Sequence, residues 1–261
     1  MASGGASTVP AGDVSRTGPG GLPVVFLHGL RTSRTMWRAQ LATVAAFGHR
    51  ALAVDLPGHG ERTDEPFTLD GAVEAVRAAV DEVGGRALVV GLSLGGYVGI
   101  AHAARHPEQV AGLVAASCCT RPHAAVVGAW DLASHLILRL PDGGAGLNDL
   151  FVRLALPPAG AADAGAGGFA LGVMSPVLRA LRGVDVLGDL RRVVAPVWLV
   201  NGRFDHFRGE ERAFLAACRD GRLVVVPGAT HLVSLVRPTR FGRAVLEALA
   251  VAEERERVAT R

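Results

Sequence analysis

Apolar runs alternate with helix-spaced segments along most of the chain. Each run is short, rich in valine, leucine and alanine, and bounded by breakers, which is typical of a strand buried on both faces. The predicted strands are 22–27, 51–54, 87–92, 110–116, 197–200 and 223–226. Helical spacing of apolar residues predicts helices at 35–47, 69–83, 95–105, 210–218 and 236–252. Because the joins are short, we expect an α/β fold with a doubly wound, mostly parallel sheet.

Residues 121–189 interrupt this alternation. Helical pieces are predicted at 129–139 and 177–181, and the glycine- and alanine-rich stretch 159–168 between them is predicted to be flexible. We therefore expect residues 22–120 and 190–261 to form the core and residues 121–189 to form an inserted helical cap.

The segment before the first strand, residues 1–21, is rich in glycine, alanine, serine and proline. It lacks the basic start and apolar centre of a secretory signal, so we expect a disordered tail. No apolar run approaches the ~20 residues that a membrane span requires. The sequence predicts a soluble, cytoplasmic protein that does not interact with a membrane.

Composition and charge narrow the function further. The chain has 261 residues, 49% of them hydrophobic and 20% charged, which fits one large globular domain. Its formal net charge of +3 comes from scattered arginines without a basic stripe, so nucleic-acid binding is not expected. The cysteines, Cys118, Cys119 and Cys218, have neither disulfide-framework nor zinc-ligand spacing, and we expect them to be small buried residues.

A glycine-flanked serine stands between a predicted strand and a predicted helix. The segment Gly91-Leu92-Ser93-Leu94-Gly95 fits the nucleophile elbow G-x-S-x-G in its required strand–turn–helix context. Glycines are needed because the sharp turn crowds the backbone on both sides of the serine. The turn also lifts the serine Oγ above the sheet and aims a helix N-terminus at it. Ser93 is therefore the predicted nucleophile.

A serine hydroxyl needs a base to accept its proton and an acid to orient that base. His231 follows the strand at 223–226, and Asp205 follows the strand at 197–200. Both positions lie at carboxyl ends of parallel strands, where open α/β sheets place their sites. The order Ser93, Asp205, His231 is also the order expected with an elbow serine. We expect these three residues to form a catalytic triad.

Other titratable residues fit these roles less well. His206 adjoins Asp205 in the chain and is expected to point away from it. A common alternative place for the acid, after the strand at 110–116, holds Ser117. His28 and His59 lie in breaker-rich loops, and we expect them to be structural partners of the loop backbone.

The oxyanion of the reaction needs two backbone N–H donors. We expect one from Leu94, directly after the nucleophile, and one from Leu30 in the loop after the first strand, with Arg31 as the alternative. Four aromatic residues are candidates for the substrate pocket, although aromatic residues more often simply pack in the core. They are Trp37, Tyr97, Trp130 and Phe169.

Together these motifs resemble those of the α/β-hydrolase superfamily. The matching pieces run in the family's order over residues 22–250, cap excluded, and are His28-Gly29, Asp55 to Gly60, Gly91 to Gly96, Asn201 to Asp205 and Gly228 to His231. The resemblance implies a mostly parallel sheet with a cap over the site. Since only a short segment precedes Leu22, the first two strands of the eight-stranded fold are expected to be missing. The cap matches no substrate subclass.

The resemblance also implies carboxylic ester or thioester chemistry, acting on a small-molecule acyl substrate. Ser93 would form an acyl-enzyme that water hydrolyses, without a metal or an organic cofactor. Two alternatives remain open. The same triad serves acyltransferases, lactonases and cyclases, and the same fold serves non-catalytic ligand-binding proteins.

Overall fold

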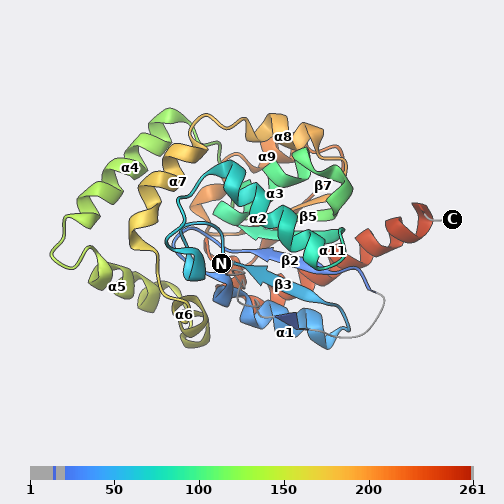
Figure 1. Cartoon of the computed structure of the whole chain (residues 1–261), viewed down its shortest axis with the longest axis horizontal. Helices are drawn as coiled ribbons and strands as arrows, with labels where there is room; N and C mark the ends of the chain where they lie inside the picture. Colours follow the sequence, from blue (N-terminus) through green and yellow to red (C-terminus); the bar gives the residue numbers. More distant parts are fainter. Residues whose placement is uncertain (1–13, 16–20, 260–261) are drawn as a thin grey trace, which may run out of the picture.

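A seven-stranded sheet forms the centre of the protein in this computed structural model, which describes residues 14–15 and 21–259 (Figure 1). The strands are β1 (Val14–Ser15), β2 (Val24–Leu27), β3 (Ala51–Val54), β4 (Ala87–Leu92), β5 (Val110–Ala116), β6 (Val197–Gly202) and β7 (Gly221–Val226). In the order β1-β3-β2-β4-β5-β6-β7, all neighbours pair in parallel except β1, which is antiparallel to β3. The six predicted strands and their parallel arrangement are confirmed.

Helices cover both faces of the sheet, because alternate residues of a strand point to opposite sides. Val25 and Leu27 of β2 pack in the same apolar layer as α2 (Leu69–Glu82), α3 (Leu94–Arg105), α8 (Val186–Arg192) and α9 (Glu211–Ala217). Val24 and Phe26 pack in the opposite layer with α1 (Arg38–Ala46), α10 (Val233–Val236) and α11 (Pro238–Ala259). Burial on both faces explains why the central strands are almost continuously apolar.

The region expected to form the cap is helical, and its helices lie together at the left of the view, beyond the carboxyl ends of β2 and β3 (Figure 1). They are α4 (Ala124–Leu138), α5 (Ala145–Ala155), α6 (Pro158–Gly165) and α7 (Met174–Leu181). The chain rejoins the core slightly earlier than residue 189, because α8 already packs against α3 and α9.

The prediction of a flexible segment at 159–168 is wrong, since α6 occupies most of it. Pro158 lies in the first turn, where its missing N–H costs nothing, and the alanines that follow are strong helix formers. Gly160 lets the helix approach the core closely, because a Cβ there would lie only 2.9 Å from the Leu235 carbonyl oxygen. Helix α5 was not predicted either.

Part of the predicted N-terminal tail belongs to the sheet. Val14 and Ser15 form β1 and pair with Leu52 and Ala51, so the expectation of disorder is wrong for these two residues. The sheet accordingly has seven described strands, one more than the expected six. The rest of that prediction, for residues 1–13 and 16–20, lies outside the described residues. None of the described helices is long and apolar enough to cross a bilayer.

Candidate active site

The turn between β4 and α3 holds Ser93 in a backbone conformation that side chains rarely adopt. Its φ is 54° and its ψ is −112°. The flanking glycines leave no room for a side chain: a Cβ on Gly91 would lie 2.1 Å from the Gly95 carbonyl oxygen, and a Cβ on Gly95 would lie 2.2 Å from that of Leu27. The Ser93 N–H donates to the Ala116 carbonyl at 2.8 Å, which fixes the turn to the end of β5.

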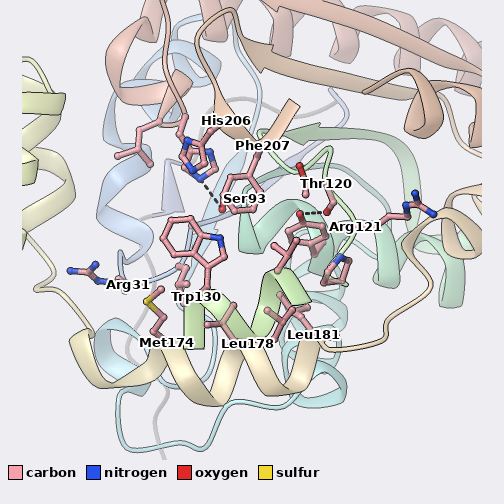
Figure 2. A pocket seen from close by; sticks show the side chains of 18 residues that line it. Arg31, Ser93, Thr120, Arg121, Trp130, Met174, Leu178, Leu181, His206 and Phe207 are labelled. Carbon is pink, nitrogen blue, oxygen red and sulfur yellow. Dashed lines mark hydrogen bonds between the residues drawn. The ribbon is translucent and has the colours of Figure 1, made fainter. Parts of the chain in front are cut away.

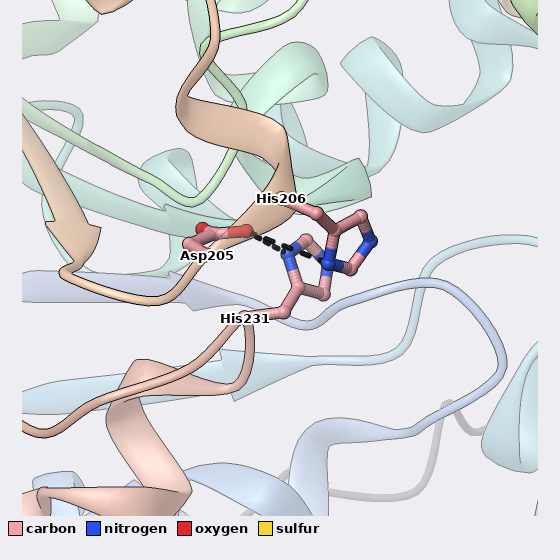
Figure 3. A group of neighbouring side chains, drawn as sticks. All are labelled: Asp205, His206 and His231. Carbon is pink, nitrogen blue, oxygen red and sulfur yellow. Dashed lines mark hydrogen bonds and ion pairs between the residues drawn. The ribbon is translucent and has the colours of Figure 1, made fainter.

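Ser93, His231 and Asp205 meet above the carboxyl ends of β4, β6 and β7. His231 Nε2 lies 3.1 Å from Ser93 Oγ. On the other side of the ring, His231 Nδ1 lies 2.9 Å from Asp205 Oδ1 (Figure 3). Both distances are within hydrogen-bond range, although the residues are far apart in the sequence. The structure therefore brings together the three residues predicted as a triad. The arrangement lets the histidine accept the serine proton while the aspartate fixes the imidazole orientation.

The Asp205 carboxylate is buried, with 5% of the residue exposed. Burial alone would raise the pKa of Asp205, but the hydrogen bond and charge of His231 outweigh it, and the pKa is lowered. The backbone N–H of Phe207 also donates to Asp205 Oδ1, at 2.8 Å. Asp205 is thus held as an anion that accepts the Nδ1 proton, which favours the tautomer with a free Nε2 lone pair facing Ser93.

Two backbone N–H groups are available beside the nucleophile. Among the described residues, neither Leu30 N–H nor Leu94 N–H donates a hydrogen bond to a protein acceptor. Leu94 is the first residue of α3, where a helix has unpaired donors and a favourable dipole for negative charge. Leu30 lines the same cavity as Ser93. This placement fits the predicted oxyanion donors, and Arg31 N–H, also without an acceptor, remains the alternative.

A cavity of about 250 Å³ opens onto Ser93 between the core and the cap (Figure 2). Its walls are mainly apolar. The core contributes loop residues beside the triad, while α4 and α7 contribute the facing wall through Val126, Val127, Trp130, Met174, Leu178 and Leu181. An apolar cavity with few polar groups at one point is the usual form of a small-molecule site.

Two of the four candidate aromatic residues line this cavity and two do not. Tyr97 and Trp130 are on its wall. Trp37 is fully buried in the core between Phe26 and Phe241, with ring centroids 5.0 and 5.8 Å away, because its helix packs inward against the sheet. Phe169 lines a separate hollow, formed with the loop around Phe67. The assignment of these last two to the substrate pocket is therefore corrected.

The loop after β6 adds two residues that the sequence did not identify. His206 and Phe207 line the cavity, and their ring centroids lie 4.9 and 4.8 Å from that of His231. The expectation that His206 points away from Asp205 is wrong: its Nδ1 is 4.0 Å from Asp205 Oδ1 (Figure 3). A single turn of 3-10 helix at His206–Arg208 brings the side chain back, and no sequence pattern marks such a turn.

Three neighbouring side chains could also bind a metal ion, namely those of Asp205, His206 and His231. Their potential ligand atoms all lie within 4.8 Å of one another. Imidazole and carboxylate groups suit zinc and related ions. Two of the three are already hydrogen-bonded to each other, so an ion here would compete with the triad. The geometry fits an inhibitory ion better than a catalytic one, because catalysis needs His231 free to accept the serine proton.

The two loop histidines are structural, as expected. His28 Nδ1 donates to the Gly29 carbonyl at 2.8 Å, and its Nε2 accepts from the Leu56 N–H at 3.0 Å. Burial, with a smaller contribution from nearby His59, lowers the pKa of His28 to about 3, so the ring stays neutral. His59 Nδ1 lies 3.0 Å from the Pro57 carbonyl. Cys118 and Cys119 are fully buried free thiols, whereas Cys218 is half-buried.

Several known proteins are similar to this chain over most of its length. The pimeloyl-[acyl-carrier protein] methyl ester esterase of Edwardsiella ictaluri is 32% identical over 248 residues, which cover 88% of this chain and 94% of that protein. Two solved structures share the fold. A thermophilic esterase from Thermogutta terrifontis superposes with a TM-score of 0.77 at 23% identity, over 93% of each chain. An enol-lactonase from Burkholderia xenovorans gives 0.73 at 21% identity, over 88% and 92% of the two chains.

The profile of the alpha/beta hydrolase family matches residues 24–244, from the first parallel strand into the last helix. This range contains the elbow, both loops of the triad and the whole cap. The chain therefore belongs to the alpha/beta hydrolase family.

Proposed function

We propose that this protein is a serine esterase that hydrolyses small carboxylic esters or thioesters through an acyl-enzyme on Ser93. The observation that carries the proposal is the continuous hydrogen-bonded line from Ser93 Oγ through His231 to Asp205, opening into an apolar cavity. The esterase of Edwardsiella ictaluri, which aligns over most of the chain, supports the same activity class.

In the acylation step, Ser93 Oγ attacks the carbonyl carbon of the ester while its proton passes to His231 Nε2. The carbonyl oxygen becomes negative and is bound by the N–H groups of Leu30 and Leu94. The imidazolium is stabilised by the Asp205 carboxylate. As the tetrahedral intermediate collapses, the bond to the alcohol or thiol breaks, and His231 returns its proton to the leaving group.

Deacylation repeats these steps with water as the nucleophile. His231 Nε2 takes a proton from water, whose oxygen attacks the acyl carbon. The carboxylic acid leaves as Ser93 regains its proton. Apart from the substrate and water, the proposed steps need only Ser93, His231, Asp205 and the two backbone N–H groups.

Labelling with a fluorophosphonate probe tests the nucleophile directly. We expect the native protein to be labelled at Ser93, and neither Ser93→Ala nor heat-denatured protein to react. Ser93→Ala should lower the kcat for a short-chain 4-nitrophenyl ester by several powers of ten. Asp205→Asn should lower it by about 10⁴-fold, as in trypsin-like proteases, because the imidazole then takes the wrong tautomer. Native protein that is folded but unlabelled would refute the proposal.

Acyl transfer by the same triad is the second candidate, favoured by the apolar lining of the cavity. Product analysis separates the two reactions. If an added alcohol accepts most of the acyl group at concentrations far below that of water, the protein is an acyltransferase. Free acid as the main product supports the esterase. A lactonase or cyclase would be recognised by a single ring-opened or ring-closed product.

A further inference from the structure

Arg31 lines the substrate cavity next to the oxyanion residue Leu30. Its backbone has a φ of 70°, which is unusual for a residue other than glycine, and its carbonyl accepts the N–H of Ala170 at 3.0 Å. Figure 2 shows the Arg31 side chain at one edge of the lining residues, on the side opposite to Arg121. Arg31 is half-buried, and the cavity that it lines is mainly apolar.

The positive charge of Arg31 has no acidic partner among the residues that the structure describes. Its one polar side-chain contact is neutral: Nη2 donates to Asn148 Oδ1 of α5 at 2.5 Å. Its Nε is buried and finds no acceptor within the described chain. Arg121, the other arginine of the cavity, is different, because its Nη2 lies 2.6 Å from Glu210 Oε1. Within the described part of the chain, only one of the two charges is therefore neutralised.

Partial burial of a guanidinium without an anionic partner costs free energy, and a bound anion would offset this cost. Burial lowers the pKa of Arg31, with no carboxylate to offset this, yet arginine keeps its proton in proteins. The planar fork of donors matches a carboxylate, which it can bind through two parallel hydrogen bonds. The geometry thus provides one anion-binding group in the same cavity as the nucleophile.

We propose that Arg31 binds a free carboxylate of the substrate, so that the preferred substrates are esters or thioesters that carry a second, ionised acid group. This inference rests on the proposed function of the Ser93 site and specifies its substrate class. The ester carbonyl lies at Ser93, the apolar chain follows the wall formed by Trp130 and Met174, and the carboxylate reaches the guanidinium.

Paired probes measure this preference. The monomethyl esters of succinic to suberic acid carry the carboxylate, and the corresponding dimethyl esters are neutral molecules of nearly equal shape. The readout is the ratio of kcat/KM for each monoester to that for its diester. In a second arm, acetyl esters of ω-hydroxy acids and their methyl esters place the carboxylate on the alcohol side of the scissile bond.

We expect the native ratio to favour the anionic ester at its best chain length. Arg31→Met should reduce that ratio by about ten-fold or more, the effect of losing a charge-assisted hydrogen bond in a partly buried site. Arg31→Lys should retain part of it, since the charge remains but the fork is lost. Arg153→Met is the matched control, and it should leave the ratio unchanged, because Arg153 is an exposed arginine of α5 that does not line the cavity.

Asn148→Ala tests whether Arg31 merely holds the loop to the cap. If Asn148→Ala lowers the ratio as much as Arg31→Met, or if Arg31→Met leaves the ratio unchanged, the inference is wrong. Calorimetric titration of Ser93→Ala with each monoester gives a readout without turnover, and Arg31→Met in that background should weaken binding of the tightest one by a similar factor. If no ester is hydrolysed and Ser93 is not labelled, the proposed function fails, and this binding experiment still decides the role of Arg31.

Discussion

The imidazole of His206 lies against that of His231, with ring centroids 4.9 Å apart, and both rings are close to the Asp205 carboxylate. Zinc binds neutral imidazoles and carboxylates. It should therefore bind between these three side chains and displace the proton shared by His231 and Asp205. We therefore predict that Zn²⁺ inhibits ester hydrolysis reversibly. Activity measured with increasing Zn²⁺, and again after a chelator is added, checks this prediction.

Inhibition by Zn²⁺ should depend on the imidazole of His206. His206→Gln should require more Zn²⁺ for half-inhibition, because one of three ligands is lost. His135→Gln is the control, since His135 lies in the cap and is exposed. Equal inhibition of both variants and the native protein would show that the metal acts elsewhere.

The two tryptophans Trp37 and Trp130 should separate stability from substrate selection. Trp37 is fully buried, and Trp37→Ala should cost about 3–5 kcal/mol of unfolding free energy by leaving a core cavity. Trp130 is 41% exposed on the cavity wall, so Trp130→Ala should change stability little and raise kcat/KM for esters with bulky acyl groups. Urea unfolding and a series of acyl esters measure both quantities. The reverse pattern would contradict the placement of either side chain.

Two glycine-to-alanine changes should differ in outcome: one should abolish activity, and the other should stabilise the protein. A methyl group at Gly91 would lie 2.1 Å from the Gly95 carbonyl oxygen, so Gly91→Ala should displace the elbow and abolish activity even in protein that still folds. Gly128 lies on the exposed face of α4 with no atom within 4 Å of an added Cβ. Gly128→Ala should therefore stabilise the helix by up to about 1 kcal/mol. Thermal unfolding and kcat check the pair, and an active Gly91→Ala would refute the crowding argument.

Stability should fall as the solution is made acidic, because buried histidines resist protonation. Burial is the main cause that lowers the pKa of His28 to about 3 and that of His102 to about 4, from 6.5 in the unfolded chain. Between these values the unfolded state binds more protons, so the stability present above pH 6.5 is lost as the pH falls towards 4 and 3. Urea unfolding from pH 8 to pH 4 measures the loss. His102→Leu should flatten this dependence, whereas the exposed control His135→Gln should leave it unchanged.

The parallel sheet and the positions of the triad could be predicted because local patterns determine them. Continuous apolar runs predict the central strands, and parallel pairing places Ser93, Asp205 and His231 at the same edge. The cap could not be predicted as well, because the packing partners of its helices lie far away in the sequence, as α4 against α7 and α6 against residues 34–37 show. Helix α6 is the clearest case, since its glycines suggest flexibility until Gly160 is seen against Leu235.

Aromatic residues and His206 show a second limit of sequence patterns. The side-chain direction of Trp37 depends on how its helix packs against Phe26 and Phe241, which no short motif encodes. His206 is turned back towards Asp205 by one turn of 3-10 helix, and the antiparallel pairing of β1 with β3 likewise involves only two residues.

All the groups assigned to bond cleavage belong to the core, while the wall facing Ser93 belongs to helices α4 and α7 of the cap. Substitutions on α4 and α7 can therefore change the shape of this wall without changing the groups assigned to bond cleavage. For protein engineering, libraries restricted to the inward positions of α4 and α7 should change which molecules are accepted and retain the catalytic machinery.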